Sequence, residues 1–342
     1  MLRSDIIVIG GGPAGAVFAS RISDRYSVTM IYGEKQKPCG GLLSEDAQLY
    51  FAERNIVLPK DITVDPQVFA VDTIDIDQGL TRRYQRFYIN TDRSKFDGWM
   101  RSFVPDKVGK IVGTVIKIER GNEGFTVTYL QDGMEKKISG EYIVGADGAN
   151  SIVRHTLFRD RIIRHYVSIQ QSFPAKDGIP NYACIFDRKT TECCAWLIKK
   201  DGETLFGGVF SPDRCRDSFE EMKKRMRDHG IELGEPSGTE ACLVLRPKSS
   251  GQIFRGKNNA FLIGEAAGFI SPSSFEGISK AMYSAEALAE AFESGAPLKY
   301  YRKKTAVMRF GIFLKLFKCP FMYSPFLRKI VMKTGVTAIK NK

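Results

Sequence analysis

The stretch that decides the fold reads Ile6-Ile7-Val8-Ile9-Gly10-Gly11-Gly12-Pro13-Ala14-Gly15. An apolar run of strand length leads directly into a G-x-G-x-x-G pattern, and residues 16–22 follow with a composition typical of a helix. A strand, a glycine turn and a helix in this order predict a dinucleotide-binding unit. We expect Gly10 to permit the tight turn, Gly12 to admit a pyrophosphate, and Gly15 to let helix and strand pack closely. Pro13 and Ala14 open the helix, whose N-terminus attracts anions.

A second strand is expected at residues 28–32, and its end would carry an acid for the ribose of the adenosine. The strand register places Tyr32 at this position, whereas the acid occurs slightly later, at Glu34. Either Glu34 reaches the ribose from the loop, or a hydroxyl or backbone group of Tyr32 takes its place. The chain has a single G-x-G-x-x-G pattern, so NAD(P)H is expected only as a transient electron donor, with a protein donor as the alternative.

Two later segments have the pattern of flavin-binding motifs. Asp147-Gly148 begins a D-G-x-x-S-x-V-R pattern, which resembles the DG motif of the flavin hydroxylase superfamily. Gly264-Glu265-Ala266-Ala267 resembles the superfamily's G-D-A-A motif, with Glu in place of Asp. The resemblance implies that Asp147 lies near the pyrophosphates and that Glu265 binds the ribityl chain of FAD. A helix expected from Gly277 and Ile278 would direct its N-terminal amides at the flavin ring.

Two segments between the first and second motifs carry further resemblances. Arg93-x-x-Phe96-Asp97 resembles the superfamily's R-x-x-F-D helix start, which implies a contact between Arg93 and FAD. A capped helix without that contact is the alternative. Pro38-Cys39-Gly40-Gly41 resembles the Cys-Gly-Gly loop of the geranylgeranyl reductase family, which implies that Cys39, Gly40 and Gly41 lie beside the flavin ring. Cys39 is a candidate proton donor, with a buried structural thiol as the alternative.

The segment from Cys194 to Lys200 resembles the Y-x-W-x-F-P-K pattern of the same family, with Trp196 and Lys200 matching. The Tyr, Phe and Pro of the pattern are replaced, which predicts an altered substrate face. Trp196 is a candidate catalytic residue, and an ordinary core position is the alternative. The loop at Cys39, the DG motif and the Glu265 motif also look like the CbrA-type flavoproteins, a bacterial subgroup that likewise has Glu in the third motif.

These motifs predict an α/β fold in which a Rossmann-like FAD-binding domain of the p-hydroxybenzoate hydroxylase type is interleaved with an antiparallel-sheet substrate domain and followed by C-terminal helices. We assign the FAD-binding domain to residues 1–66, 92–158 and 250–298, and the substrate domain to residues 67–91 and 159–249. Alternating hydrophobicity predicts strands of one sheet at residues 182–186, 192–198 and 204–210. A charged helix is expected to start at a capping box on Ser218 and to end at Gly230.

The net charge of +12 comes from residues 299–342, which contain twelve Lys or Arg and no Asp or Glu. We expect a basic helical tail here, interrupted by Pro320 and Pro325. An apolar stripe in this tail consists of Val307, Phe310, Leu314 and Phe317. The pattern favours peripheral contact with a membrane, and a solvated helix is the alternative. No apolar run has the length of a membrane-spanning helix, so a cytoplasmic location is expected, with the inner face of the membrane as the peripheral site.

The seven cysteines show no C-x-x-C pairing and the three histidines no metal-ligand spacing, so we expect neither a disulfide framework nor a metal site. The function expected is reduction of a C=C bond in an isoprenoid-like or other apolar substrate by hydride from reduced FAD. One alternative is a flavin monooxygenase of the hydroxylase class. A second is a membrane-associated flavoprotein that binds a lipid carrier without turnover. We expect a small-molecule or lipid-like partner and no nucleic acid.

Overall fold

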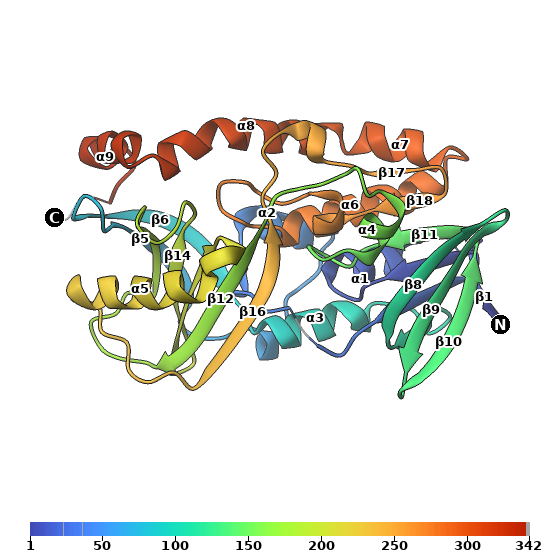
Figure 1. Cartoon of the computed structure of the whole chain (residues 1–342), viewed down its shortest axis with the longest axis horizontal. Helices are drawn as coiled ribbons and strands as arrows, with labels where there is room; N and C mark the ends of the chain where they lie inside the picture. Colours follow the sequence, from blue (N-terminus) through green and yellow to red (C-terminus); the bar gives the residue numbers. More distant parts are fainter. Residues whose placement is uncertain (23, 36, 340–342) are drawn as a thin grey trace. The chain divides into compact units, whose positions relative to one another are not determined.

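A computed structural model describes residues 1–22, 24–35 and 37–339 (Figure 1). The chain divides into two compact units, each built from three segments. The first unit contains Met1–Gln36, Ser94–Arg164 and Leu245–Leu314, and the second contains Lys37–Arg93, His165–Val244 and Lys315–Lys342. Residues 37–66, which the sequence analysis assigned to the FAD-binding domain, fall in the second unit because β4 (Leu42–Leu43) pairs with a strand of that unit.

The first unit is organised around a six-stranded sheet with the strand order β17-β18-β11-β2-β3-β7. Neighbouring strands are parallel except for the edge strand β17. All four residues of the central strand β2 are buried, which explains why it reads as a continuous apolar run. The strands are β2 Ile6–Ile9, β3 Val28–Tyr32, β7 Gly109–Val112, β11 Tyr142–Gly145, β17 Gly256–Lys257 and β18 Ala260–Leu262.

A smaller sheet and several helices complete the first unit. Helices α1 and α6 pack against each other, with the rings of Phe18 and Phe292 in edge contact at 5.9 Å. The second sheet has the order β1-β10-β9-β8, with β1 Leu2–Arg3, β8 Thr114–Gly121, β9 Gly124–Gln131 and β10 Met134–Gly140. The helices are α1 Pro13–Arg21, α3 Arg93–Ser102, α4 Ile152–Leu157, α6 Ile278–Phe292, α7 Pro297–Lys304, and the short η3 Ser250–Gln252 and η4 Gly264–Ala267. Helix α8 Ala306–Tyr323 begins in the first unit and continues into the second after Leu314.

The second unit is built on an eight-stranded sheet with the order β16-β12-β15-β14-β13-β5-β6-β4. The three alternating stretches predicted from the sequence form the neighbouring antiparallel strands β13, β14 and β15, which confirms that prediction. The strands beyond β4 are β5 Val68–Asp75, β6 Leu80–Asn90, β12 His165–Pro174, β13 Tyr182–Phe186, β14 Ala195–Lys200, β15 Glu203–Phe210 and β16 Gly238–Leu245.

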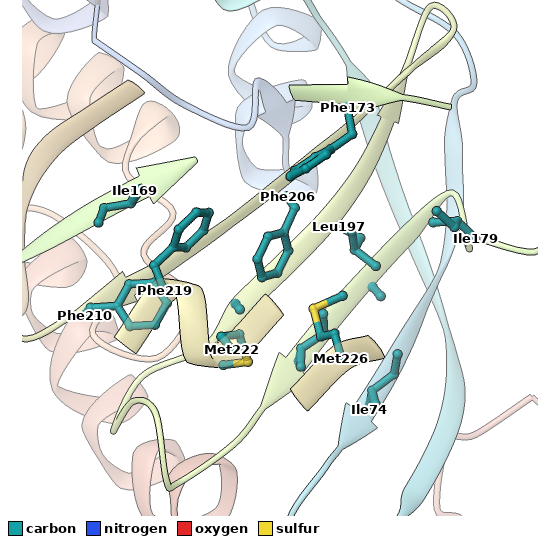
Figure 2. Packing of buried hydrophobic residues seen from close by; sticks show 13 residues of the cluster. Ile74, Ile169, Phe173, Ile179, Leu197, Phe206, Phe210, Phe219, Met222 and Met226 are labelled. Atoms are coloured by element: carbon teal, nitrogen blue, oxygen red, sulfur yellow. The ribbon is translucent and has the colours of Figure 1, made fainter. Parts of the chain in front are cut away.

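Helix α5 (Cys215–Asp228) covers one face of this sheet (Figure 2). Its buried residues Phe219, Met222 and Met226 lie among the side chains of the sheet, so the helix is part of the core. The predicted start at Ser218 was wrong, because the 3-10 turn η2 (Pro212–Arg214) leads directly into the helix without a side-chain cap. The remaining helices of this unit are η1 Lys60–Ile62, α2 Glu45–Ala52 and α9 Pro325–Thr334.

The C-terminal region is helical, as predicted, and it is interrupted before Pro325 as expected, but the interruption predicted at Pro320 was wrong. Helix α8 continues through Pro320 to Tyr323, and α9 begins at Pro325. Pro320 lies near the end of α8, so only one backbone hydrogen bond of the last turns is lost. Across the described part of the chain, no helix is both long enough and apolar enough to span a bilayer.

Candidate functional site

The glycine-rich turn at the end of β2 has the geometry of a phosphate-binding loop. Gly10 has a φ of +109°, and a Cβ there would overlap the carbonyl oxygen of Ala146. A Cβ on Gly15 would overlap the carbonyl oxygen of Gly10. By contrast, a Cβ on Gly12 would meet no described atom within 4 Å. Two glycines therefore permit close packing, while the third leaves open space at the N-terminus of α1, which fits an anionic group such as a pyrophosphate.

The residue at the end of β3 is tied to this loop. A Cβ on Gly11 would lie 2.6 Å from Cγ of Tyr32, so the Tyr32 ring packs directly on the glycine turn. Nη1 of Arg101 donates a hydrogen bond of 3.1 Å to the carbonyl oxygen of Gly11, and the guanidinium lies 5.4 Å from the centre of the Tyr32 ring. Glu34 is exposed in the loop that follows. The ribose contact of Tyr32 or Glu34 stays a prediction, and Arg101 is a neighbour of the loop that no sequence motif indicated.

Asp147 of the DG motif follows β11 and presents one unsatisfied oxygen. Its Oδ2 accepts a hydrogen bond of 3.3 Å from the N–H of Val153. Its Oδ1 is buried and has no hydrogen-bond partner among the described residues. Burial raises the pKa of the Asp147 carboxyl, against the hydroxyl of Ser151 and nearby backbone N–H groups, which lower it. A buried acceptor without a donor is costly, so the site fits a ligand with hydrogen-bond donors, as FAD has.

Arg154 connects the second and third motifs. It is buried, Nη2 donates to the carbonyl oxygen of Ala149 at 2.7 Å, and Nη1 donates to that of Ala266 at 2.9 Å. Burial lowers the pKa of Arg154, while the carboxylates of Asp147 and Glu265 raise it. These two hydrogen bonds hold Arg154 against both motifs.

Glu265 lies in η4, and its Oε1 accepts a hydrogen bond of 2.9 Å from the N–H of Leu245. Gly264 before it has a φ of +56°, and a Cβ there would lie 3.1 Å from Cβ of Ala14 and 3.3 Å from Cβ of Ala281. The third motif therefore lies close to both α1 and α6. Helix α6 begins at Ile278 with Gly277 as its N-cap. The contacts predicted for Gly264, Glu265, Gly277 and Ile278 with FAD stay predictions.

In the second unit, the Cys39 loop lies on one face of β14. A Cβ on Gly40 would be 2.6 Å from Cδ1 of Ile198, and a Cβ on Gly41, whose φ is +68°, would be 3.0 Å from Nζ of Lys200. Alternate residues of a strand share a face, so Trp196, Ile198 and Lys200 point to the same side. The two segments that resemble the geranylgeranyl reductase family are thus packed together.

Trp196 occupies the start of this face. A Cβ on Gly207 of the neighbouring strand β15 would lie 2.7 Å from the indole ring, so the ring rests on the backbone of Gly207. Nε1 of Trp196 is buried, and within the described chain it has no hydrogen-bond acceptor. An indole N–H is a donor only, so the face offers one buried donor beside an apolar surface.

Lys200 is the titratable residue on the side of β14 that carries Trp196 and Ile198. It was not among the predicted site residues. Its Nζ donates to Oδ1 of Asn90 at 2.8 Å and to the carbonyl oxygen of Thr91 at 2.7 Å. The hydroxyl of Thr91 donates in turn to the carbonyl oxygen of Gly41 at 2.6 Å. Burial lowers the pKa of Lys200 to about 8, although the charges of Cys39, Asp92 and Asp201 raise it.

The pKa of the Cys39 thiol is also lowered. Burial raises the pKa of its thiol, but the guanidinium of Arg93, the N–H of Gly41 and the ammonium of Lys37 outweigh this effect and hold the pKa below its usual value. The N–H of Gly41 lies 3.5 Å from Sγ. Arg93 thus contacts Cys39, whereas its predicted contact with FAD stays a prediction. Since Cys39 is biased toward the thiolate, Lys200 is the better candidate for a proton donor.

Comparison with known proteins identifies the family. A family profile described as an FAD binding domain matches residues 114–178, which include the DG motif. The chain is 42% identical over 350 residues to the protein CbrA of Escherichia coli O6:H1, and the match covers 99% of this chain and 95% of CbrA. The chain belongs to the CbrA family. The resemblance found in the sequence is thereby confirmed, and FAD is supported as the cofactor of this CbrA-family protein.

Solved structures share the fold of this CbrA-family chain. A geranylgeranyl bacteriochlorophyll reductase-like protein from Thermoplasma acidophilum has a TM-score of 0.77 at 17% identity, covering 97% of this chain and 91% of that chain. The p-nitrophenol 4-monooxygenase of Pseudomonas putida has a TM-score of 0.71 at 13% identity, covering 100% of both chains. These identities show the fold alone. The predicted fold class, an α/β flavoprotein of the hydroxylase type with C-terminal helices, is confirmed.

Proposed function

We propose that this CbrA-family protein is an FAD-dependent reductase that saturates a C=C bond in an isoprenoid-like or other apolar substrate. The observation that carries the proposal is the pairing of Cys39 with Lys200 on an otherwise apolar strand face. Reduction of a C=C bond needs a hydride for one carbon and a proton for the other. The pKa of Lys200, at about 8, suits a group that delivers a proton at neutral pH.

FAD, when bound and reduced, supplies the hydride. In the proposed reaction Lys200 gives its proton to the second carbon and is then reprotonated from solvent. The cations Arg93 and Lys37 lower the pKa of Cys39, and the negative charge of a Cys39 thiolate would favour the protonated form of Lys200 before each turnover. An electron donor, NAD(P)H or a protein, then restores the reduced flavin.

The strand face also supports an apolar substrate. The partly exposed indole ring of Trp196 presents hydrophobic surface, and its Nε1 offers a single hydrogen bond for a polar end group, while Ile198 is buried beside Gly40 of the Cys39 loop. Apolar pockets with few polar groups are typical of sites for lipid-like ligands. A roughly apolar substrate with one acceptor near the double bond fits this arrangement best.

The test uses the purified FAD-loaded protein, reduced chemically without oxygen and then mixed with unsaturated polyprenyl lipids. We expect the flavin to be reoxidised and the product to be two hydrogens heavier. The Lys200→Met variant should bind FAD but reoxidise at least about tenfold more slowly, in keeping with the usual contribution of a general acid. A conservative Cys39→Ser variant removes the thiol but keeps Lys200, so it tests the contribution of each residue separately.

The same experiment distinguishes the alternatives. Substrate-dependent oxygen uptake in the presence of NAD(P)H, with a hydroxylated product, would replace the reductase by a monooxygenase. Reduced flavin that stays reduced with every unsaturated lipid, while such lipids still bind, would favour a lipid-binding flavoprotein without turnover.

A further inference from the structure

The C-terminal segment combines positive charge with exposed bulky apolar side chains. Residues 299–342 carry twelve Lys or Arg and no acidic residue, while the rest of the chain has equal numbers of basic and acidic residues. Helices α8 and α9 form most of this segment (Figure 1). Within the described chain, Arg328 pairs with Asp75 and Lys304 with Glu290, whereas Lys318 of α8 and Lys333 of α9 are exposed.

The inner face of α9 is fixed to the sheet of the second unit. Arg328 is buried and donates to both carboxylate oxygens of Asp75, at 2.7 and 3.0 Å, and to Asp77 at 3.3 Å. Met332 is also buried, and its carbonyl oxygen accepts a hydrogen bond of 3.0 Å from Arg82. These contacts define which side of α9 faces the protein, and therefore which side faces outward.

Contacts on either side of α9 extend this attachment. The rings of Tyr323 and Phe186 are in edge contact at 5.8 Å. After the helix, the N–H of Ile339 donates to the carbonyl oxygen of Arg83 at 2.8 Å, and Ala338 forms a bridge with Tyr84. The end of the chain is thus held against the second unit over its whole described length, so its outward side chains have defined positions.

The outward side of these helices is hydrophobic. Phe317 is 61% exposed and Phe326 is 70% exposed. On α8 the exposed residues recur every three or four positions, which places them along one side of the helix. Bulky side chains in water contribute nothing to stability and mark an interaction surface. The exposed apolar residues of the second unit are Phe317 and Phe321 on α8, and Phe326, Ile330 and Val331 on α9.

We propose that α9 and the part of α8 in the second unit dock on an anionic lipid bilayer, with the exposed aromatic and aliphatic side chains in the boundary of the acyl chains and the exposed Lys318 and Lys333 at the headgroups. The absence of acidic residues in residues 299–342 matches a negatively charged membrane surface. A second copy of this chain fits less well, because it would bring the same positive segment into contact with itself. The bilayer would also be the source of an apolar substrate.

The experiment measures sedimentation of the FAD-loaded protein with vesicles of phosphatidylcholine alone or mixed with phosphatidylglycerol. The test variant is Phe317→Ser with Phe326→Ser. The matched control is Phe69→Ser with Phe87→Ser, because these two aromatic residues of the second unit are also exposed, 68% and 45%, but lie on the sheet. Retained FAD and an unchanged circular dichroism spectrum verify that both variants are folded.

We expect wild type and control to bind the anionic vesicles and to be released by salt. The test variant should bind at least about tenfold more weakly, since each Phe that enters the bilayer contributes enough hydrophobic free energy for about that factor. Equal binding of test variant and wild type would overturn the proposal. Equal binding of the wild type to neutral and to anionic vesicles would also overturn it. So would a wild type that does not bind vesicles but self-associates, if the same two substitutions abolish the self-association.

Discussion

The replacement of Lys200 by Met tests the buried ammonium by its effect on stability. Burial lowers the pKa of Lys200 from its usual 10.5 to about 8. At about 1.4 kcal/mol per pKa unit, protonation of Lys200 in the folded protein costs on the order of 3 kcal/mol relative to the unfolded chain. Between these two values the unfolded chain binds more protons than the folded protein. The free energy of unfolding of the wild type should therefore rise with pH from about pH 8 to pH 10.5.

Lys200→Met removes this titration. It also leaves Oδ1 of Asn90 and the carbonyl oxygen of Thr91 without their donor, at about 1–3 kcal/mol each. Below pH 8 the loss of these hydrogen bonds lowers the free energy of unfolding, while removal of the charged ammonium raises it. The two effects nearly cancel, so the variant should be about as stable as the wild type. As the pH rises to 10.5, the wild type should gain about 3 kcal/mol over the variant.

Urea denaturation at constant ionic strength over this pH range measures the difference. Cys39 also contributes, because its folded pKa lies below the unfolded value of 9.0, so the stability from its thiolate rises with pH and is lost as the pH falls through the folded value. A Cys39→Ser variant removes that contribution and should keep the rise due to Lys200. The reasoning is refuted if Lys200→Met shows the same pH dependence as the wild type.

Three further changes have defined outcomes. Gly12→Leu fills the open space at the N-terminus of α1, so the protein should fold but lose its yellow colour; a stoichiometric flavin spectrum would contradict the site. Arg154→Met removes the hydrogen bond to Ala149 within the second motif and the one to Ala266 in the third, and should lower flavin affinity and reduce the free energy of unfolding by about 2–4 kcal/mol; unchanged melting with FAD would argue against this role. Arg328→Met leaves Asp75 buried without its cation and should destabilise the protein by about 3–5 kcal/mol in urea unfolding, while Arg83→Met, at an exposed ion pair, should cost less than about 1 kcal/mol.

The elements that were predicted correctly depend on local sequence. The strand, glycine turn and helix at residues 6–21 follow from a contiguous pattern, and a φ of +109° at Gly10 agrees with the turn that glycine was expected to permit. The alternating strands β13, β14 and β15 follow from periodicity. The start of α5 and the continuation of α8 through Pro320 were missed, because both depend on neighbouring turns and packing that a short pattern does not contain.

The contact between the Cys39 loop and Lys200 of β14 could not be predicted from the sequence. Both motifs were visible in the sequence, and Lys200 was noted as a matching residue. Their contact depends on the pairing of β4 with β6 and on the register of β14, which bring distant segments together. No local signal indicates that Lys200 is buried, and burial is the main cause of its lowered pKa.

The family, the flavin-binding motifs and the basic character of the C-terminal tail could be recognised without a structure, because each is carried by contiguous residues or by composition. Three-dimensional contacts were needed to see that Arg154 links two motifs, that Lys200 lies against the Cys39 loop, and that aromatic side chains of α8 and α9 are exposed. The physical reason is that burial and hydrogen bonding depend on what surrounds a side chain, and those surroundings come from strands and helices far away along the chain.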